Sequence, residues 1–324
     1  MMPQPQQLGR LLGPGLLRFL LAALVVVSHL TSLNVGRPAV LLFFMLSGFW
    51  VARLLARWET GTITFLASRA LRIWPLYALV TVVAWALLAR TGAPHPADPW
   101  SALMLLGLAA RPGDVLGVSW SLDLELQFYF ALPLIALALA RAGVAITLAG
   151  AALAFAVGAW LFDQGWLTFL FHLPVFLAGV LVQHFAWRPS GRLAAASVVL
   201  AGLGAGLILL VPAWNGLLLK ASFADSLAEN LGHILWVLLL VPFIAWNVHQ
   251  PSDRRDRWLG DMSYTLYLVH LPVVKLLAQF VPAMDLAAKL LALALIALVS
   301  LAVFFGLDRP LEARRARLWR RHPA

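Results

Sequence analysis

Arg18 and His29 are the residues whose types and spacing point most directly to chemistry. They close the run RFLLAALVVVSH, in which the ten intervening residues are apolar or small. Eleven residues rise about 16 Å along an α-helix, which would place the two side chains in opposite halves of a membrane. Imidazole has the ordinary pKa nearest neutrality, so His29 is a candidate general base. A histidine hydrogen-bonded to a backbone carbonyl near the interface is the competing interpretation.

Arg69 and Arg72 form a second candidate group, in the run SRALRIWPLY. Residues at positions i and i+3 share one face of a helix, and paired guanidinium groups suit phosphate oxygens. Arginines at the cytoplasmic end of a membrane span are also an ordinary topological signal. The spacing alone therefore leaves a phosphate clamp and a membrane anchor open.

The run SWSLDLELQFYFALPL over residues 119–134 supplies the third group, Asp123 and Glu125. Two positions apart on a helix, these carboxylates point about 200° apart, so they are not a paired acid and base. We expect Ser121 to cap this helix and both acids to complement its dipole. We also expect Glu125 on the same outer half as His29, where a carboxylate can orient an imidazole.

The remaining polar residues within apolar runs favour packing. Ser47 and Gly48 predict close helix contact. His172 and His270, each followed by Leu-Pro, are expected to be buried and hydrogen-bonded, with cavity lining as the second interpretation. The chain has no cysteine and no HxxxH or HExxH spacing, so we predict neither a thiolate nor a metal site.

These candidates must be positioned by membrane helices. The chain is 62% hydrophobic and 12% charged, about half the charged fraction of a soluble domain. About 20 apolar residues span a bilayer core, and ten runs qualify. They are 16–34, 38–57, 72–90, 121–141, 143–162, 166–187, 193–212, 230–249, 262–281 and 287–307. The fold class predicted is an all-α polytopic membrane protein with about ten transmembrane helices and one short re-entrant or surface helix at 100–110.

The basic residues predict the orientation. Over these ten spans, eighteen arginines fall on one side, against Arg37, Arg90, Arg111 and Lys220 on the other. The positive-inside rule then places both termini in the cytoplasm. The net charge of +10 is explained by topology, and we do not expect a nucleic-acid partner. The first apolar run is too long for a cleavable signal peptide and should stay as an anchor.

The order of the motifs carries a family resemblance. Arg-x10-His is followed by FFMLSGFW, Arg69-x-x-Arg72 before IWPLY, SWSLDLELQFYFALP, LGDMSYTLYLVHLPV and LDRPLE. Together, from Arg18 to about Glu312, they resemble the membrane-bound acyltransferase 3 family, integral-membrane O-acyltransferases of bacterial sugars. The resemblance implies transfer of an acyl group, usually acetyl, from cytoplasmic acyl-CoA to a hydroxyl of an extracytoplasmic carbohydrate or glycolipid. It also implies a multi-pass protein of the bacterial inner membrane that contacts membrane lipid.

The resemblance also implies residue roles. His29 matches the family's catalytic histidine, and Glu125 matches the glutamate of its Trp-Ser-Leu-x-x-Glu motif. Arg69 and Arg72 match the arginines expected to hold the coenzyme's phosphates, and Arg18 matches the basic residue of the first motif and joins them as a candidate donor-binding residue.

Two positions depart from the family pattern: Gln127 replaces a second acidic residue, and Asp308 stands where a glutamate is usual. The expected division is a cytoplasmic segment 1–15, a transmembrane acyltransferase domain 16–308 and a basic cytoplasmic tail 309–324, which we expect to anchor on the membrane surface. We expect no periplasmic esterase-like domain and no metal cofactor.

One function of another class stays open on the sequence. Several spans with intramembrane His and Glu are also compatible with a proton-coupled transporter or exporter of a small or acylated metabolite. Transporters commonly show inverted repeats and paired broken helices, and neither pattern is visible here.

Overall fold

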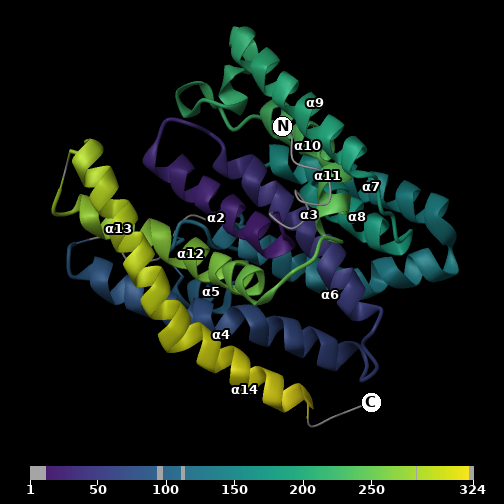
Figure 1. Cartoon of the computed structure of the whole chain (residues 1–324), viewed down its shortest axis with the longest axis horizontal. Helices are drawn as coiled ribbons and strands as arrows, with labels where there is room; N and C mark the ends of the chain where they lie inside the picture. The colour runs from purple at the N-terminus through teal and green to yellow at the C-terminus, as the bar shows by residue number, and fades with distance from the viewer. Residues whose placement is uncertain (1–11, 93–97, 111–113, 282, 321–324) are drawn as a thin grey trace. The chain divides into compact units, whose positions relative to one another are not determined.

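The computed structural model describes residues 12–92, 98–110, 114–281 and 283–320, and these form helices and loops (Figure 1). Within this described part the only β pairing is an isolated antiparallel bridge between Leu33 and Leu219. The chain divides into two compact units, Met1–Ala56 with Leu134–Ser263 and Arg57–Pro133 with Tyr264–Ala324.

The first unit is built around helix α3. Its elements are α2 (Pro14–Leu30), α3 (Gly36–Leu55), α7 (Gly143–Asp163), α8 (Phe169–His184), α9 (Gly191–Leu210), the 3₁₀ turns η1 (Pro212–Leu217) and η2 (Lys220–Ser222), α10 (Leu227–Leu238) and α11 (Val241–Asn247). Helices α3 and α8 make the most extensive contact, and α3 also packs against α2 and α10.

Glycines permit the close approach of α3 and α8. A Cβ atom on Gly48 would lie 2.1 Å from the carbonyl oxygen of Phe176, and one on Gly179 would lie 2.0 Å from the carbonyl oxygen of Met45. Neither position can hold a larger residue without separating the two backbones, because small residues are what let membrane helices touch. The prediction of close packing at Gly48 is confirmed.

Helix α2 begins against helix α12 (Arg254–Ala278). The carboxylate of Asp256 accepts hydrogen bonds from the backbone N–H groups of Gly15 at 3.0 Å and Leu16 at 2.8 Å. These are among the N–H groups that a helix N-terminus leaves without an intrahelical partner. A residue 240 positions away therefore fixes where α2 starts.

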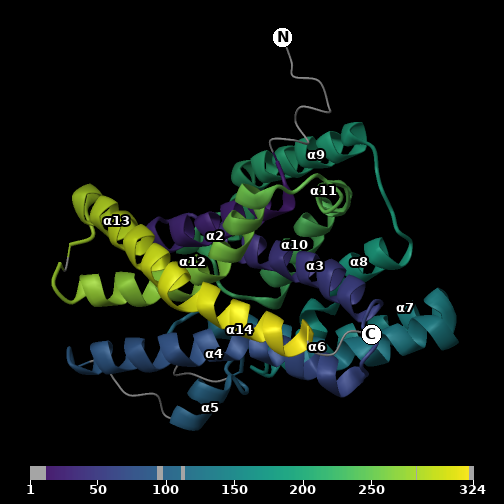
Figure 2. The same ribbon diagram turned by 60° about the horizontal axis from the view of Figure 1, so that its bottom comes forward.

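The second unit contains α4 (Thr62–Ala89), α5 (Pro99–Met104), α13 (Leu286–Val303), the π-helical turn η3 (Phe304–Asp308) and α14 (Arg309–Arg320). Helices α6 (Ser119–Arg141) and α12 contribute residues to both units. From α13 through η3 to α14 the chain is one continuous helical rod (Figure 1). Helix α14 lies along α4 (Figure 2).

Every predicted apolar run overlaps a helix, yet fewer helices meet a spanning criterion. Among the described residues six helices are long and apolar enough to cross a membrane, or up to seven if α10 and α11, which meet at 47°, form one span. Helices α2 and α8 are apolar but shorter than 18 residues. The all-helical, multi-pass class is confirmed, while ten spans and the cytoplasmic side of the termini stay predictions.

Two expected helix starts differ from the structure. Helix α4 begins at Thr62, ten residues before the predicted run, so Arg69 and Arg72 lie inside it. Helix α6 begins at Ser119, whose N–H donates to the Asp114 carboxylate at 2.6 Å. The prediction that Ser121 caps this helix is wrong, because its hydroxyl instead donates to the carbonyl of Val118 at 3.0 Å.

Candidate active site

Arg18 and His29 lie in the same helix, α2, as the spacing predicts. Eleven residues at about 100° each bring them within about 20° of the same face, about 16 Å apart along the axis. His29 is exposed and lies in the last helical turn, where a cation complements the helix dipole. Arg18 lies near the other end, beside Gly260 of α12.

The end of α2 that carries His29 is held by a lysine from a distant segment. The ammonium of Lys220 donates to the carbonyl oxygen of Ser28, and to that of Thr31 at 3.3 Å. These carbonyls flank His29 at the C-terminal end of α2, and that of Ser28 also accepts from the N–H of Thr31 at 3.4 Å. Partial burial lowers the pKa of Lys220 from its ordinary value of 10.5.

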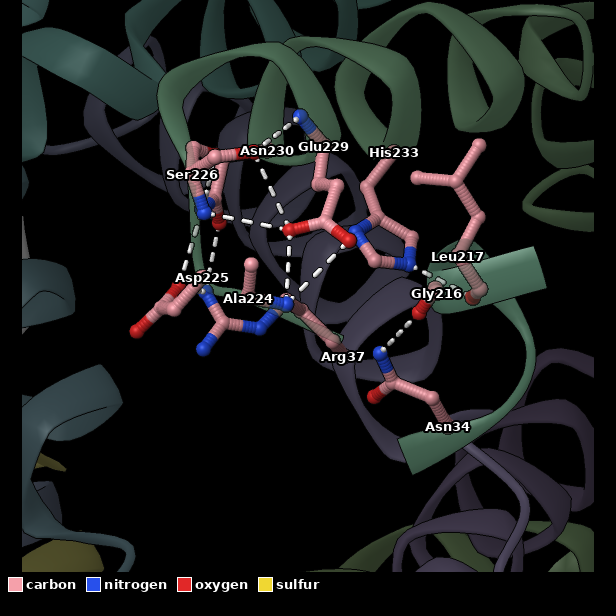
Figure 3. Close-up of polar contacts among 10 residues, drawn as sticks. All are labelled: Asn34, Arg37, Gly216, Leu217, Ala224, Asp225, Ser226, Glu229, Asn230 and His233. Carbon is pink, nitrogen blue, oxygen red and sulfur yellow. Dashed lines mark hydrogen bonds and ion pairs between the residues drawn. The ribbon is translucent and has the colours of Figure 1, made fainter. Parts of the chain in front are cut away.

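The backbone adds a short two-stranded contact next to this lysine. The N–H of Lys220 donates to the carbonyl of Ser32 at 2.9 Å, and the N–H of Asn34 donates to the carbonyl of Leu218 at 2.7 Å. The side-chain amide of Asn34 donates to the carbonyl of Gly216 at 3.1 Å (Figure 3). The loop that follows His29 is thus hydrogen-bonded along its length to the segment that contains η1 and η2.

Arg37, at the start of α3, joins the same segment to α10. Its Nη1 atom lies 2.5 Å from Oδ1 of Asn230 and 3.1 Å from Oδ1 of Asp225 (Figure 3). The guanidinium also lies over the ring of Phe223, 4.8 Å from its centroid. Asn230 in turn donates to Asp225 at 2.9 Å. This cluster ties the beginnings of α3 and α10 together.

Helix α10 starts in a capping box that supports the cluster. The hydroxyl of Ser226 accepts from the N–H of Glu229 at 3.3 Å, and the Glu229 carboxylate accepts from the N–H of Ser226 at 3.1 Å. Glu229 also accepts from the N–H of Ala224 at 3.0 Å (Figure 3). One turn later, Nε2 of His233 bonds the carbonyl of Leu217 at 2.8 Å. Both ends of the η1–η2 segment are therefore anchored to α10.

In the second unit, Arg69 and Arg72 converge with charged residues that follow α13. Nη1 of Arg72 lies 3.5 Å from Oδ1 of Asp308 and 3.3 Å from Oε1 of Glu312. Its guanidinium lies 5.2 Å from the ring centroid of Tyr264, whose hydroxyl donates to the carbonyl of Ile73 at 2.7 Å. The Asp308 side chain is only 3% exposed, and the positive charge of Arg72 offsets the cost of burying this carboxylate.

Ser68 connects Arg69 to the end of the helical rod. Nη2 of Arg69 donates to the Ser68 hydroxyl at 3.4 Å, and Nη1 of Arg315 donates to the same hydroxyl at 3.3 Å. Arg315 makes a bidentate pair with Glu312, with its shortest contact at 2.6 Å. Nε of Arg69 is buried and has no hydrogen-bond acceptor among the described residues.

Glu125 and Asp123 have separate partners, as their spacing predicts. The Glu125 carboxylate accepts from the hydroxyl of Tyr129 at 2.6 Å. The buried Asp123 accepts from the backbone N–H of Ala109 at 3.0 Å and from the side chain of Gln127 at 3.1 Å. Asp123 therefore holds the loop before α6, and Gln127, which departs from the family pattern, satisfies its second oxygen.

The predicted arginines and His29 fall in two groups, one in each unit. Arg69 and Arg72 share one cluster on α4, while Arg18 and His29 share α2 in the first unit. The sequence alone did not predict the structural roles of Lys220 and Arg315: Lys220 served only to assign the topology, and Arg315 belonged to the basic tail expected to anchor on the membrane surface. The positions 308, 312 and 315 fall on one helical face, and that spacing is the signal that could have revealed Arg315.

A family model described as an acyltransferase domain, of the acyltransferase 3 family, matches residues 12–309. The chain belongs to this family. Neither the curated proteins nor the solved structures contain a match to it. Membership supports an acyltransferase activity in general, and with the apolar helices it supports a multi-pass membrane protein.

Two further histidines of this acyltransferase that the sequence singles out, His172 and His270, are packed in the helices. His270 is fully buried, and its Nδ1 lies 2.8 Å from the carbonyl of Tyr267, within its own helix. His172 is buried between the edges of the rings of Phe44 and Phe171. Burial of both side chains, and the hydrogen bond of His270, are confirmed. In the described ranges no three His, Asp or Glu side chains are grouped to hold a metal ion.

Proposed function

We propose that this acyltransferase moves an acyl group, most simply acetyl, from cytoplasmic acyl-CoA to a hydroxyl of a carbohydrate or glycolipid acceptor. The match of the family model over residues 12–309 carries the proposal. The matched range includes His29, the arginine pair and Glu125, whose roles rest on the motif resemblance. The proposed location is a bacterial inner membrane, with the acceptor on the outer side.

The Arg72 cluster, formed by Arg69, Arg72, Asp308, Glu312 and Arg315, is a suitable place for the donor's phosphates. Arg69, Arg72 and Arg315 supply three positive charges, against the two carboxylates of Asp308 and Glu312. A buried guanidinium N–H without an acceptor is costly, and Nε of Arg69 is one. Phosphate oxygens would satisfy both the surplus charge and the missing acceptor. Acyl-CoA would supply the activated thioester.

His29 is proposed as the general base. A neutral imidazole at the end of α2 would accept the proton of the acceptor hydroxyl as that oxygen attacks the thioester carbonyl. The C–S bond would then break, and the CoA thiolate would leave and take the proton back from the imidazolium as free CoA thiol. Base catalysis of this type contributes about 10²–10⁴-fold. Glu125 is proposed to orient the imidazole, and this role rests on its motif alone. Arg18, on the same face of α2, is proposed to act on the donor side.

The experiment measures the release of free CoA thiol from acetyl-CoA when the purified full-length protein is incubated with candidate glycan acceptors. Acceptor-dependent thiol release that disappears in His29→Ala, with the variant still inserted in the membrane, supports the proposal. Full activity in His29→Ala would remove the base assignment. Flux of a substrate across vesicles without thioester consumption would favour a transporter and contradict the acyl transfer.

The arginine pair is tested separately. In the double variant Arg69→Ala/Arg72→Ala, CoA binding measured by titration calorimetry should fall by at least tenfold, because two guanidinium contacts are lost. Unchanged affinity would return the pair to the role of membrane anchor. Exposed Arg192→Ala is the matched control and should bind CoA as the wild type does.

A further inference from the structure

We propose that Arg315 is a third guanidinium of the donor's phosphate site, so that helix α14 completes this site against α4. The inference rests on the proposed function and extends it. It changes the role of the C-terminal helix from a surface anchor to a part of the donor site.

The first observation is that two cations meet at one hydroxyl. Arg69 and Arg315 donate to Ser68 Oγ at 3.4 Å and 3.3 Å, and Ser68 is 1% exposed. One hydroxyl is a weak acceptor for two positively charged groups. Their mutual repulsion is strong where water is scarce, and an anion between them would turn it into attraction.

The second observation is the unsatisfied donor. Nε of Arg69 is buried with no acceptor in the described part of the chain, although guanidinium N–H groups in proteins are normally paired. The carboxylates of Asp308 and Glu312 lie with Arg72 and Arg315 instead. The cluster therefore has more donors than acceptors on the side of Arg69, which a multi-oxygen anion would correct.

The third observation is that Arg315 differs from the neighbouring arginines of α14 in its exposure and in the helix that it faces. Arg314 and Arg317, which flank Arg315 on α14, are exposed, whereas the Arg315 side chain is 20% exposed. An i,i+3 pair with Glu312 on a solvated face would leave Arg315 in water and contribute little. Its reach to Ser68 of α4, a contact across 247 positions, shows that this arginine faces the other helix.

The ligand that fits is a phosphate group of a nucleotide-bearing donor. Three guanidinium forks, two on α4 and one on α14, suit a tetrahedral dianion or a pyrophosphate better than a single carboxylate. Glu312 bridges Arg72 and Arg315, so it would compete with phosphate for both arginines.

The test measures binding of CoA, dephospho-CoA and adenosine 3′,5′-bisphosphate to the purified full-length protein by titration calorimetry. We expect Arg315→Gln to lower the affinity for CoA and for the bisphosphate about tenfold each. Arg315→Lys should recover part of that lost affinity. The matched control Arg314→Gln removes an exposed charge from the neighbouring position and should bind CoA normally. Loss of the CoA preference over dephospho-CoA would assign Arg315 to the 3′-phosphate, and equal weakening of both would assign it to the pyrophosphate.

Glu312→Gln separates phosphate binding from a structural role. It removes the partner of Arg315 but keeps the guanidinium, so CoA affinity should stay or rise. An equal loss of affinity in Glu312→Gln and Arg315→Gln would mean that the pair only holds α14, and would overturn the inference. So would unchanged CoA affinity in Arg315→Gln. If the wild-type protein bound no CoA, the proposed function would fail together with this inference, whereas normal wild-type binding with an unaffected Arg315→Gln defeats the inference alone.

Discussion

The ammonium of Lys220 donates to the backbone carbonyl of Ser28, one residue before His29. The two residues are 192 positions apart in the chain, so the end of α2 is held by a segment that belongs to another part of the first unit. A general base must stand within hydrogen-bond reach of the proton that it accepts. Lys220 is therefore a positioning residue for the proposed base.

Replacing Lys220 with methionine should lower the rate of acyl transfer through kcat. The end of α2 would lose its charged cap, and a small displacement of a catalytic group can cost about tenfold or more in rate. The KM for acyl-CoA should stay unchanged, because the hydrogen bonds of Lys220 are to the end of α2 that carries His29 and not to the end that carries Arg18. Steady-state kinetics with Lys220→Arg as a conservative rescue measures this, and Lys289→Met is the matched control. A parallel rise in KM with unchanged kcat would contradict the positioning role.

The helix that carries Arg18 and His29 was predictable from sequence, and its support was not. A run of ten apolar or small residues between them indicates a helix, since membrane helices satisfy their own backbone hydrogen bonds. The bonds from Lys220 and Asn34 depend instead on η1 and η2, short turns whose sequence has no helical period. Contacts of this separation are set by packing rather than by local pattern.

The Arg72 cluster was predictable in part. Arg69 and Arg72 were identified by their spacing, and Asp308 and Glu312 by the motif LDRPLE. The π-helical turn over Phe304–Asp308 changes the phase of the helix just before Glu312 and ends at Asp308 itself, and such turns are frequent at functional sites. The spacing of Asp308, Glu312 and Arg315 shows that they share one helical face. A hydrophobic pattern does not reveal the one-residue shift, so it did not show that this face would turn toward α4.

Replacing Asp256 with alanine should destabilise the first unit. Its carboxylate caps α2 through Gly15 and Leu16 and also accepts from the hydroxyl of Ser252 at 2.5 Å. Loss of such a cap costs about 1–2 kcal/mol, which corresponds to a fall of about 2–4 °C in Tm per kcal/mol for a chain of this size. Thermal unfolding in detergent checks the prediction. Exposed Asp163→Ala should leave Tm nearly unchanged, and an equal fall in both variants would argue against a specific cap.

The two partners of Arg37 should differ in coupling energy. Asn230 is 3% exposed and lies 2.5 Å from Nη1 of Arg37, whereas the Asp225 side chain is 57% exposed at 3.1 Å. Exposed ion pairs contribute about 0.2–1 kcal/mol, and buried hydrogen bonds to a charged group about 1.5–3 kcal/mol. Double-mutant cycles with Arg37→Met, Asn230→Ala and Asp225→Asn, measured by denaturation in mixed micelles, should therefore give the larger coupling for Asn230. A larger value for Asp225 would show that charge dominates this cluster.

Adding a methyl group at Gly48 or Gly179 should separate α3 from α8. The new Cβ would lie 2.1 Å and 2.0 Å, respectively, from a backbone carbonyl oxygen of the facing helix, and a backbone atom cannot rotate away as a side chain can. Overpacking of this type costs about 1–3 kcal/mol, and more where both helices must move. Gly150→Ala is the matched control, because its Cβ would meet no atom within 4 Å and alanine favours a helix by about 1 kcal/mol over glycine. Thermal unfolding of the three variants should show Tm falling for Gly48→Ala and Gly179→Ala and staying or rising for Gly150→Ala.

The double variant Gly48→Ala/Gly179→Ala tests whether the two glycines act at one contact. Because both substitutions push the same two backbones apart, its loss of stability should be smaller than the sum of the two single losses. Strict additivity would mean that the two glycines act at independent contacts.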